Sequence, residues 1–187
     1  KYLGGHSDLI AGAVLGNTEV MQRIKVLRTF LGNMASPHTC WLLLRSLETL
    51  KVRMEQQART AERVAAYLVK HPKILKVHYL GCLPEASEAY ALYKRQYKSP
   101  GAMIAFEVKG KEAEAFKFLN SLKLVKLAVS LGSTESLGQH PATMTHVGLD
   151  PEMKEFMGIN ERLVRLSVGL EQEEDLIADI ENALSLV

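Results

Sequence analysis

A long helical stretch in the first half of the chain places the strongest constraint on the fold. It begins at Ser36-Pro37 and closes at His71-Pro72, because proline suits the first turn of a helix and disfavours helical backbone in the residue before it. Its apolar residues recur at three- and four-residue spacing, which places them on one stripe. These residues are Leu43, Leu47, Leu50 and Met54. A helix of this length predicts a connector between two domains.

The residues before this stretch predict a strand and a shorter helix. Asp8 to Gly16 form a nearly continuous apolar run, which is typical of a strand buried on both faces. The pair Asn17-Thr18 can cap a helix that runs to about Phe30, and Gly32-Asn33 end it.

The residues after the stretch predict a different architecture, in which short strands alternate with helices. The expected strands are 74–80, 102–108, 125–130 and 163–168, and the expected helices are 111–122 and 173–186, with a shorter one within 86–98. This part therefore predicts an α+β domain, a small sheet with helices on one side.

Composition excludes several kinds of partner. The 187 residues are 47% hydrophobic and 24% charged, which is ordinary for a globular protein with a sizeable core. The net charge is only +2 and the charges are interleaved, so we expect no nucleic-acid partner. No apolar run approaches the roughly 20 residues that span a membrane. Cys40 and Cys82 lack metal-ligand spacing, which favours a reducing compartment such as the cytoplasm.

The first residue, Lys1, is a candidate for covalent chemistry. A lysine amine forms a Schiff base with an aldehyde cofactor when desolvation or nearby positive charge lowers its pKa. Gly4-Gly5 follow closely, and glycine lets the backbone turn tightly or approach a ligand. The alternative is an ordinary flexible segment that begins with lysine.

Arg165 is a candidate for binding a carboxylate. It lies in the apolar run 163–168, where a charge is costly unless it is paired. A guanidinium matches a carboxylate with two parallel hydrogen bonds, and an amino-acid substrate supplies a carboxylate. Two alternatives remain, a surface arginine on an edge strand or a pair with an internal acid such as Glu171.

Two histidines are candidates for metal ligands. His140 and His146 are six residues apart with Pro141 between them and no third ligand nearby. We therefore expect them to stabilise the loop after Ser130, and we predict no metal site.

Three segments resemble the Cys/Met-metabolism family of pyridoxal-phosphate enzymes. They are Lys1 to Asp8, Val129 to Leu137 with its continuation Gln139 to His146, and Leu163 to Glu171. They occur in the family's order and span essentially the whole chain. The resemblance implies the α/β type I aminotransferase-like fold, with residues 1–50 as the end of the large cofactor domain. Residues 51–187 would be the small C-terminal domain, with a mostly antiparallel sheet.

The resemblance also assigns roles to individual residues. It implies that Lys1 is catalytic and holds pyridoxal 5'-phosphate, and that Arg165 and Ser130 bind the substrate α-carboxylate. Val129 would face the substrate side chain, where methionine γ-lyases carry valine and cystathionine γ-lyases and γ-synthases carry an acid. Residues 28–36, in contrast, resemble the cystathionine-type enzymes and lack the Lys-Asp pair expected in methionine γ-lyases.

The implied activity is γ-elimination from a sulfur amino acid. Methionine would yield 2-oxobutyrate, ammonia and methanethiol in a homotetramer whose sites are shared across a dimer interface. Because the chain starts inside what resembles an active-site loop, we expect the C-terminal part of a longer polypeptide, with other cofactor contacts upstream of Lys1. The alternatives are a cystathionine γ-lyase, an acylhomoserine-dependent γ-synthase, or a non-catalytic interaction or regulatory module.

Overall fold

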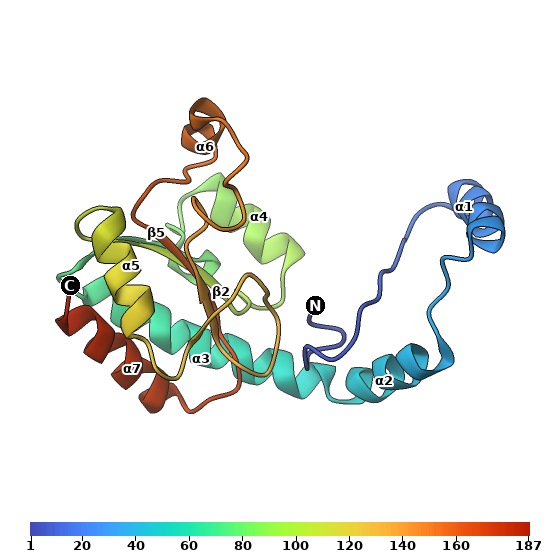
Figure 1. The fold of residues 1–187 in the computed structure, drawn as a ribbon, viewed down its shortest axis with the longest axis horizontal. Coiled ribbons are helices and arrows are strands. Elements are labelled where there is room, and N and C mark those ends of the chain that lie inside the picture. Colours follow the sequence, from blue (N-terminus) through green and yellow to red (C-terminus); the bar gives the residue numbers. More distant parts are fainter.

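A five-stranded sheet organises the second half of the chain in the computed structural model, which describes residues 1–187 (Figure 1). Its strand order is β1-β2-β5-β4-β3, and all neighbours are antiparallel except the parallel pair β3 and β4. The prediction of a small, mostly antiparallel sheet is confirmed. The strands are β1 (Ile74–His78), β2 (Met103–Val108), β3 (Lys126–Leu127), β4 (Leu137–Gln139) and β5 (Leu163–Ser167).

Alternation along the central strands separates the two faces of the sheet. In β2, Ile104 and Phe106 are buried in the core, and they stand opposite Leu166 and Val164 of β5. Because side chains alternate between faces along a strand, Arg165 of β5 points to the face opposite this core. The pleat therefore separates a charged residue from the apolar packing around it.

Three helices cover the core face of the sheet. They are α3 (Leu50–Lys70), α5 (Glu112–Ser121) and α7 (Glu173–Ser185), which lie on one side of the strands in Figure 1. Leu68, Phe118 and Leu176 are fully buried representatives of the apolar faces of these helices. No helix of the chain combines the length and the apolar character that crossing a membrane requires.

The connections contain three short elements that the sequence did not predict, in addition to the expected α4 (Glu88–Gln96). They are β4, α6 (Pro151–Phe156) and a 3-10 turn at Leu80–Cys82. All three are too short to show a hydrophobic period. The predicted strand at 125–130 is wrong in extent, because only Lys126–Leu127 pair with a neighbour.

Most of the first 49 residues form an arm that extends from the sheet and helices (Figure 1), whereas the chain begins against them, where Tyr2 packs on the core. It contains α1 (Thr18–Leu31) and α2 (Pro37–Glu48). As expected, the Asn17 side chain caps α1, accepting from the Val20 N–H at 2.9 Å, and Gly32 ends the helix at φ 73°.

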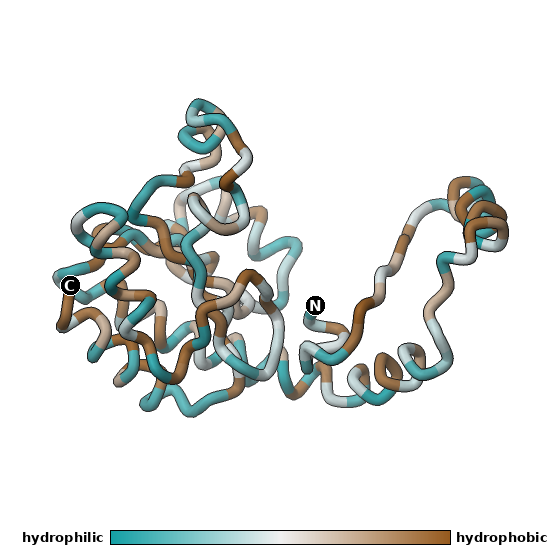
Figure 2. The backbone as a smooth tube through the Cα atoms, in the orientation of Figure 1, coloured by the Kyte–Doolittle hydropathy of each residue, from teal (hydrophilic) through white to brown (hydrophobic).

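The predicted buried strand at 8–16 is wrong. The segment is irregular and exposed, with Ile10 97% and Leu15 89% accessible, and Figure 2 shows apolar stretches along the arm. A strand needs a hydrogen-bonded neighbour and a cover for each apolar face. No strand of these 187 residues pairs with the run.

The predicted long helix is two helices, α2 and α3, separated at Thr49. The Thr49 hydroxyl donates to the Ser46 carbonyl at 3.3 Å and accepts from Arg53 Nε at 3.2 Å. The predicted apolar stripe is wrong at the start of α3, where Leu50 and Met54 are only half-buried and the buried positions are Arg53 and Gln57. Their side chains donate to backbone carbonyls, Gln57 to that of Ser133 at 2.6 Å, and the buried face becomes apolar only further along the helix.

Candidate functional site

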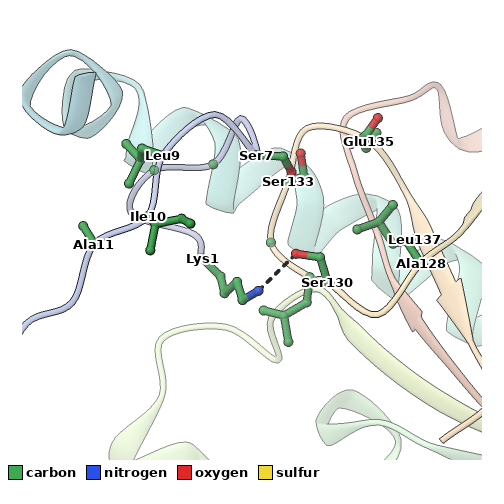
Figure 3. Close-up of a pocket in the computed structure, with 14 residues that line it drawn as sticks. Lys1, Ser7, Leu9, Ile10, Ala11, Ala128, Ser130, Ser133, Glu135 and Leu137 are labelled. Carbon is green, nitrogen blue, oxygen red and sulfur yellow. Dashed lines mark hydrogen bonds between the residues drawn. The ribbon is translucent and has the colours of Figure 1, made fainter. Parts of the chain in front are cut away.

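A cavity of about 430 Å³ lies between the opening segment of the chain and the loop that follows β3 (Figure 3). Residues 1–11 form one wall, and residues 128–137 form the other. These walls are more than 100 positions apart in the sequence, so only the fold brings them together. The volume is in the range that accommodates a small molecule.

Lys1 projects its amine into this cavity from the opening segment. Its Nζ donates a hydrogen bond to Ser130 Oγ at 3.2 Å, which Figure 3 marks as a dashed line. No ion pair joins Lys1 to a carboxylate. The amine is therefore oriented by a neutral hydroxyl at the wall of the cavity.

A buried guanidinium holds the backbone of the opening segment in place. Arg53 on α3 is only 4% exposed, and its Nη1 and Nη2 donate to the carbonyls of Tyr2 and Ser46 at 2.9 Å each. Burial lowers the pKa of Arg53. A Cβ at Gly5 would lie 2.0 Å from Nη1. Glycine is thus required here by the close approach of Arg53.

Tyr2 packs between the opening segment and the sheet. Its hydroxyl oxygen is buried without a hydrogen-bond partner, and burial raises its pKa, which the nearby Ser167 hydroxyl and the Arg165 charge partly offset. A Cβ at Gly132, where φ is +75°, would lie 2.9 Å from the Tyr2 nitrogen. The two loops therefore touch backbone to backbone beside the cavity.

Arg165 approaches the same loop from β5. Its Nη2 donates to the Ser130 carbonyl at 2.9 Å and to Gln139 Oε1 at 2.8 Å. Its Nε is buried without a partner, and burial lowers its pKa. No carboxylate pairs with Arg165, since Glu171 instead accepts from the Ser136 amide and hydroxyl. A half-buried cation with unused donors is suited to bind an anion.

Lys1 and Arg165 meet at one residue. Ser130 accepts from Lys1 through its hydroxyl and from Arg165 through its carbonyl. Arg165 does not line the cavity itself but lies behind Ser130, and Val129 is 57% exposed and also outside the lining. Lys1 and Arg165 thus contact the same residue through different atoms, one from each side of the loop.

The two histidines lie apart from the cavity lining. His140 is buried, with its ring nitrogens bonded to Thr143 Oγ1 at 2.8 Å and to the Glu161 carbonyl at 2.9 Å. His146 Nδ1 is 2.8 Å from Thr145 Oγ1. His140 therefore bonds to residues beyond β4, whereas the sequence predicts a role in the loop after Ser130.

Comparison with known proteins identifies the family. The model for the family described as Cys/Met metabolism PLP-dependent enzyme matches residues 1–185. The chain belongs to this family. The predicted family, fold class and pyridoxal-phosphate dependence are thereby confirmed.

Individual relatives carry several activities within the family. The chain is 48% identical over 186 residues to the L-methionine gamma-lyase of Porphyromonas gingivalis, covering 98% of this chain and 46% of the relative. It is 43% identical over 185 residues to the cystathionine gamma-lyase of Dictyostelium discoideum, covering 98% and 47%. A solved cystathionine gamma synthase from Xanthomonas oryzae pv. oryzae superimposes with a TM-score of 0.91 at 39% identity, covering 99% of this chain and 48% of that one. The chain thus spans about half the length of these relatives.

Family membership does not test the role of each residue. The structure brings Lys1, Ser130 and Arg165 together, and their functions remain predictions. The sequence reasoning missed Arg53 and Gln139. Arg53 carried a usable signal, since it precedes Gln57, Ala61, Val64 and Leu68 at helical spacing on the buried face of α3. Gln139 carried none, because only pairing of β4 with β5 places it beside Arg165.

Proposed function

We propose that the protein containing this chain is a pyridoxal-phosphate-dependent carbon–sulfur lyase that acts on a sulfur amino acid, with methionine γ-lyase as the specific activity. The observation that carries the proposal is the shared contact of Lys1 and Arg165 with Ser130 beside the 430 Å³ cavity. Family membership supports the same chemistry.

The residues present fit pyridoxal phosphate. Lys1 offers an amine with no ion-pair partner at the wall of a cavity of suitable volume, and it would hold the cofactor covalently. When bound, the cofactor supplies an electron sink that stabilises negative charge on the substrate carbon. Other contacts to the cofactor would come from the part of the protein outside these 187 residues.

Each residue of the site has a distinct part in the proposed mechanism. The Lys1 amine would carry protons between the substrate α- and β-carbons. Ser130 Oγ keeps that amine in position, and Arg165 binds the substrate carboxylate. Binding both ends of the substrate reduces the entropy lost on reaching the reactive geometry.

The choice of methionine rests on Val129. In the proposal this apolar side chain faces the thioether of methionine, where an acid would suit the distal ammonium group of cystathionine. Relatives named methionine γ-lyase and cystathionine γ-lyase are comparably similar, and residues 28–36 favour the cystathionine type. Cystathionine γ-lyase and γ-synthase therefore stay as alternatives. A homotetramer, a cytoplasmic location and domains at 1–50 and 51–187 are parts of the same proposal.

The first experiment tests whether Lys1 carries the cofactor. Full-length protein should gain the absorbance band of covalently held pyridoxal phosphate, and borohydride reduction should fix the label on the peptide that contains Lys1. Lys1→Ala should lose the band and all turnover, whereas Lys70→Ala, at an exposed position of α3, should keep both. Full activity in Lys1→Ala would contradict the role given to Lys1, whereas a wild-type protein with neither the band nor turnover would favour a non-catalytic module.

A second arm of that experiment ranks the substrates. Methionine, cystathionine and O-acetylhomoserine are supplied separately, and 2-oxobutyrate and ammonia are measured. The proposal expects the highest kcat/KM for methionine. Faster turnover of cystathionine would keep the lyase chemistry and replace the specific activity.

A further inference from the structure

Gln139 occupies a position that controls the orientation of Arg165. The antiparallel register of β4 and β5 sets the two residues directly opposite each other, so their side chains leave the same face of the sheet. Gln139 is 1% exposed, and its Oε1 accepts from Arg165 Nη2 at 2.8 Å.

The orientation of the Gln139 amide is fixed by its neighbours. Arginine has only donors, so the carbonyl end of the amide must face Arg165. The other end, Nε2, donates to Thr145 Oγ1 at 3.0 Å. With both ends bonded in a buried site, the amide is a rigid acceptor for the guanidinium.

These contacts leave the rest of the guanidinium for a ligand. Gln139 and the Ser130 carbonyl both accept from Nη2, whereas Nε is buried with no acceptor, and Nη1 makes no hydrogen bond within the chain. A buried donor without an acceptor is rare in folded proteins and marks a site that a ligand can complete.

We propose that Gln139 is a positioning residue that holds Arg165 in the orientation required to bind the carboxylate of the substrate. This inference rests on the proposed function, because it takes Arg165 as the carboxylate-binding residue. Ser130 contributes through its backbone, so Gln139 is the contact of Nη2 that a side-chain substitution can remove.

The test uses full-length protein loaded with pyridoxal phosphate and two ligands without a sulfur leaving group, L-norleucine and L-norleucinamide. Dissociation constants are measured by calorimetry. Wild type should prefer the carboxylate ligand. Gln139→Met keeps a side chain of similar length without the acceptor, and the preference should fall by about tenfold, as expected for losing one hydrogen bond to a charged group.

Two variants separate positioning from general damage. Gln139→Glu retains an acceptor oxygen for Arg165 Nη2 and tests orientation alone through Nε–H exchange, because its added carboxylate competes with the ligand for the guanidinium. Gln96→Met makes the same chemical change at an exposed position of α4 and should leave the preference unchanged. In 15N NMR spectra, the Arg165 Nε–H should exchange with solvent faster in Gln139→Met than in wild type and Gln139→Glu.

The outcomes distinguish the two levels of the proposal. If wild type forms no covalent adduct with the cofactor, the proposed function fails. If wild type forms the adduct and prefers the carboxylate, but Gln139→Met matches it in ligand preference and Nε–H exchange, the role of Gln139 is overturned. Equally fast Nε–H exchange in Gln139→Met and Gln139→Glu would also overturn it.

Discussion

Beside the cavity, a buried charged side chain depends on a neighbouring residue that has no side chain. Arg53 is buried without a carboxylate partner and is instead satisfied by backbone carbonyls and the Thr49 hydroxyl. Carbonyl oxygens carry partial negative charge, so they can compensate a buried guanidinium at a modest desolvation cost. The space that the guanidinium occupies is available only because Gly5 has no side chain.

At this scale we expect Gly5→Ala to disrupt the opening segment. A methyl group would collide with Arg53 at a φ of +70°, a conformation that alanine disfavours. The substitution should lower the stability of the full-length protein by about 3 kcal/mol, combining backbone strain and overpacking. Thermal unfolding and the yield of cofactor bound at Lys1 are the measurements.

Gly12→Ala is the matched control for this substitution. A Cβ at Gly12 meets no atom within 4 Å, so its effect should stay within about 0.5 kcal/mol. Equal behaviour of the two alanine variants would show that Arg53 does not require a glycine beside it.

At the scale of elements, one carboxylate connects the last helix to the segment that leads into the site. Asp179 of α7 is 8% exposed and accepts hydrogen bonds from the amides of Lys123, Leu124 and Val125 at 2.8–3.0 Å. These residues precede β3, which is only two residues long. The fixed position of Ser130 therefore depends on α7 as well as on the sheet.

We expect Asp179→Ala to weaken this connection. Three amides, of which that of Val125 is buried, would lose a charged acceptor. The loss should cost about 2–4 kcal/mol because bonds that share one acceptor are not additive. Asp175→Ala removes an exposed acid from the first turn of the same helix and should cost less than about 1 kcal/mol. Chemical denaturation of the full-length variants provides the comparison, and similar losses would refute the role given to Asp179.

At the scale of the whole molecule, the chain consists of a packed body and an arm whose apolar side chains are largely uncovered. Exposed apolar residues of this kind mark surfaces that other chain segments or subunits cover. The body is stabilised by a single cluster of 20 buried residues. Burial extends to three tyrosines, Tyr2, Tyr67 and Tyr79, and raises the pKa of each hydroxyl above its ordinary value of 10.0.

These tyrosines predict loss of stability at alkaline pH. In the unfolded chain the hydroxyls ionise near their ordinary pKa, whereas the folded protein retains the protons. Stability is therefore fully present below about pH 10 and falls as pH rises through the raised pKa values. Thermal midpoints measured from about pH 8 to 11 should decline at the upper end.

Tyr79→Phe provides the control for the pH series. It removes one of the titrating groups together with its 2.9 Å hydrogen bond to the Gly101 carbonyl, so the variant should be less stable at neutral pH but lose stability less steeply above pH 10. An unchanged slope would exclude Tyr79 as a contributor.

Local sequence determined most secondary structure and the nature of the candidate site. The Asn17 cap and the alternation in β2 each depend on residues only a few positions apart. Both can therefore be recognised from the sequence alone. Only the tertiary structure decided that the run at 8–16 is exposed and that Arg53 is buried. It also placed two distant residues in hydrogen-bond contact with Ser130, namely Lys1, 129 positions away, and Arg165, 35 positions away. Such contacts depend on how distant segments pack, which no local pattern encodes.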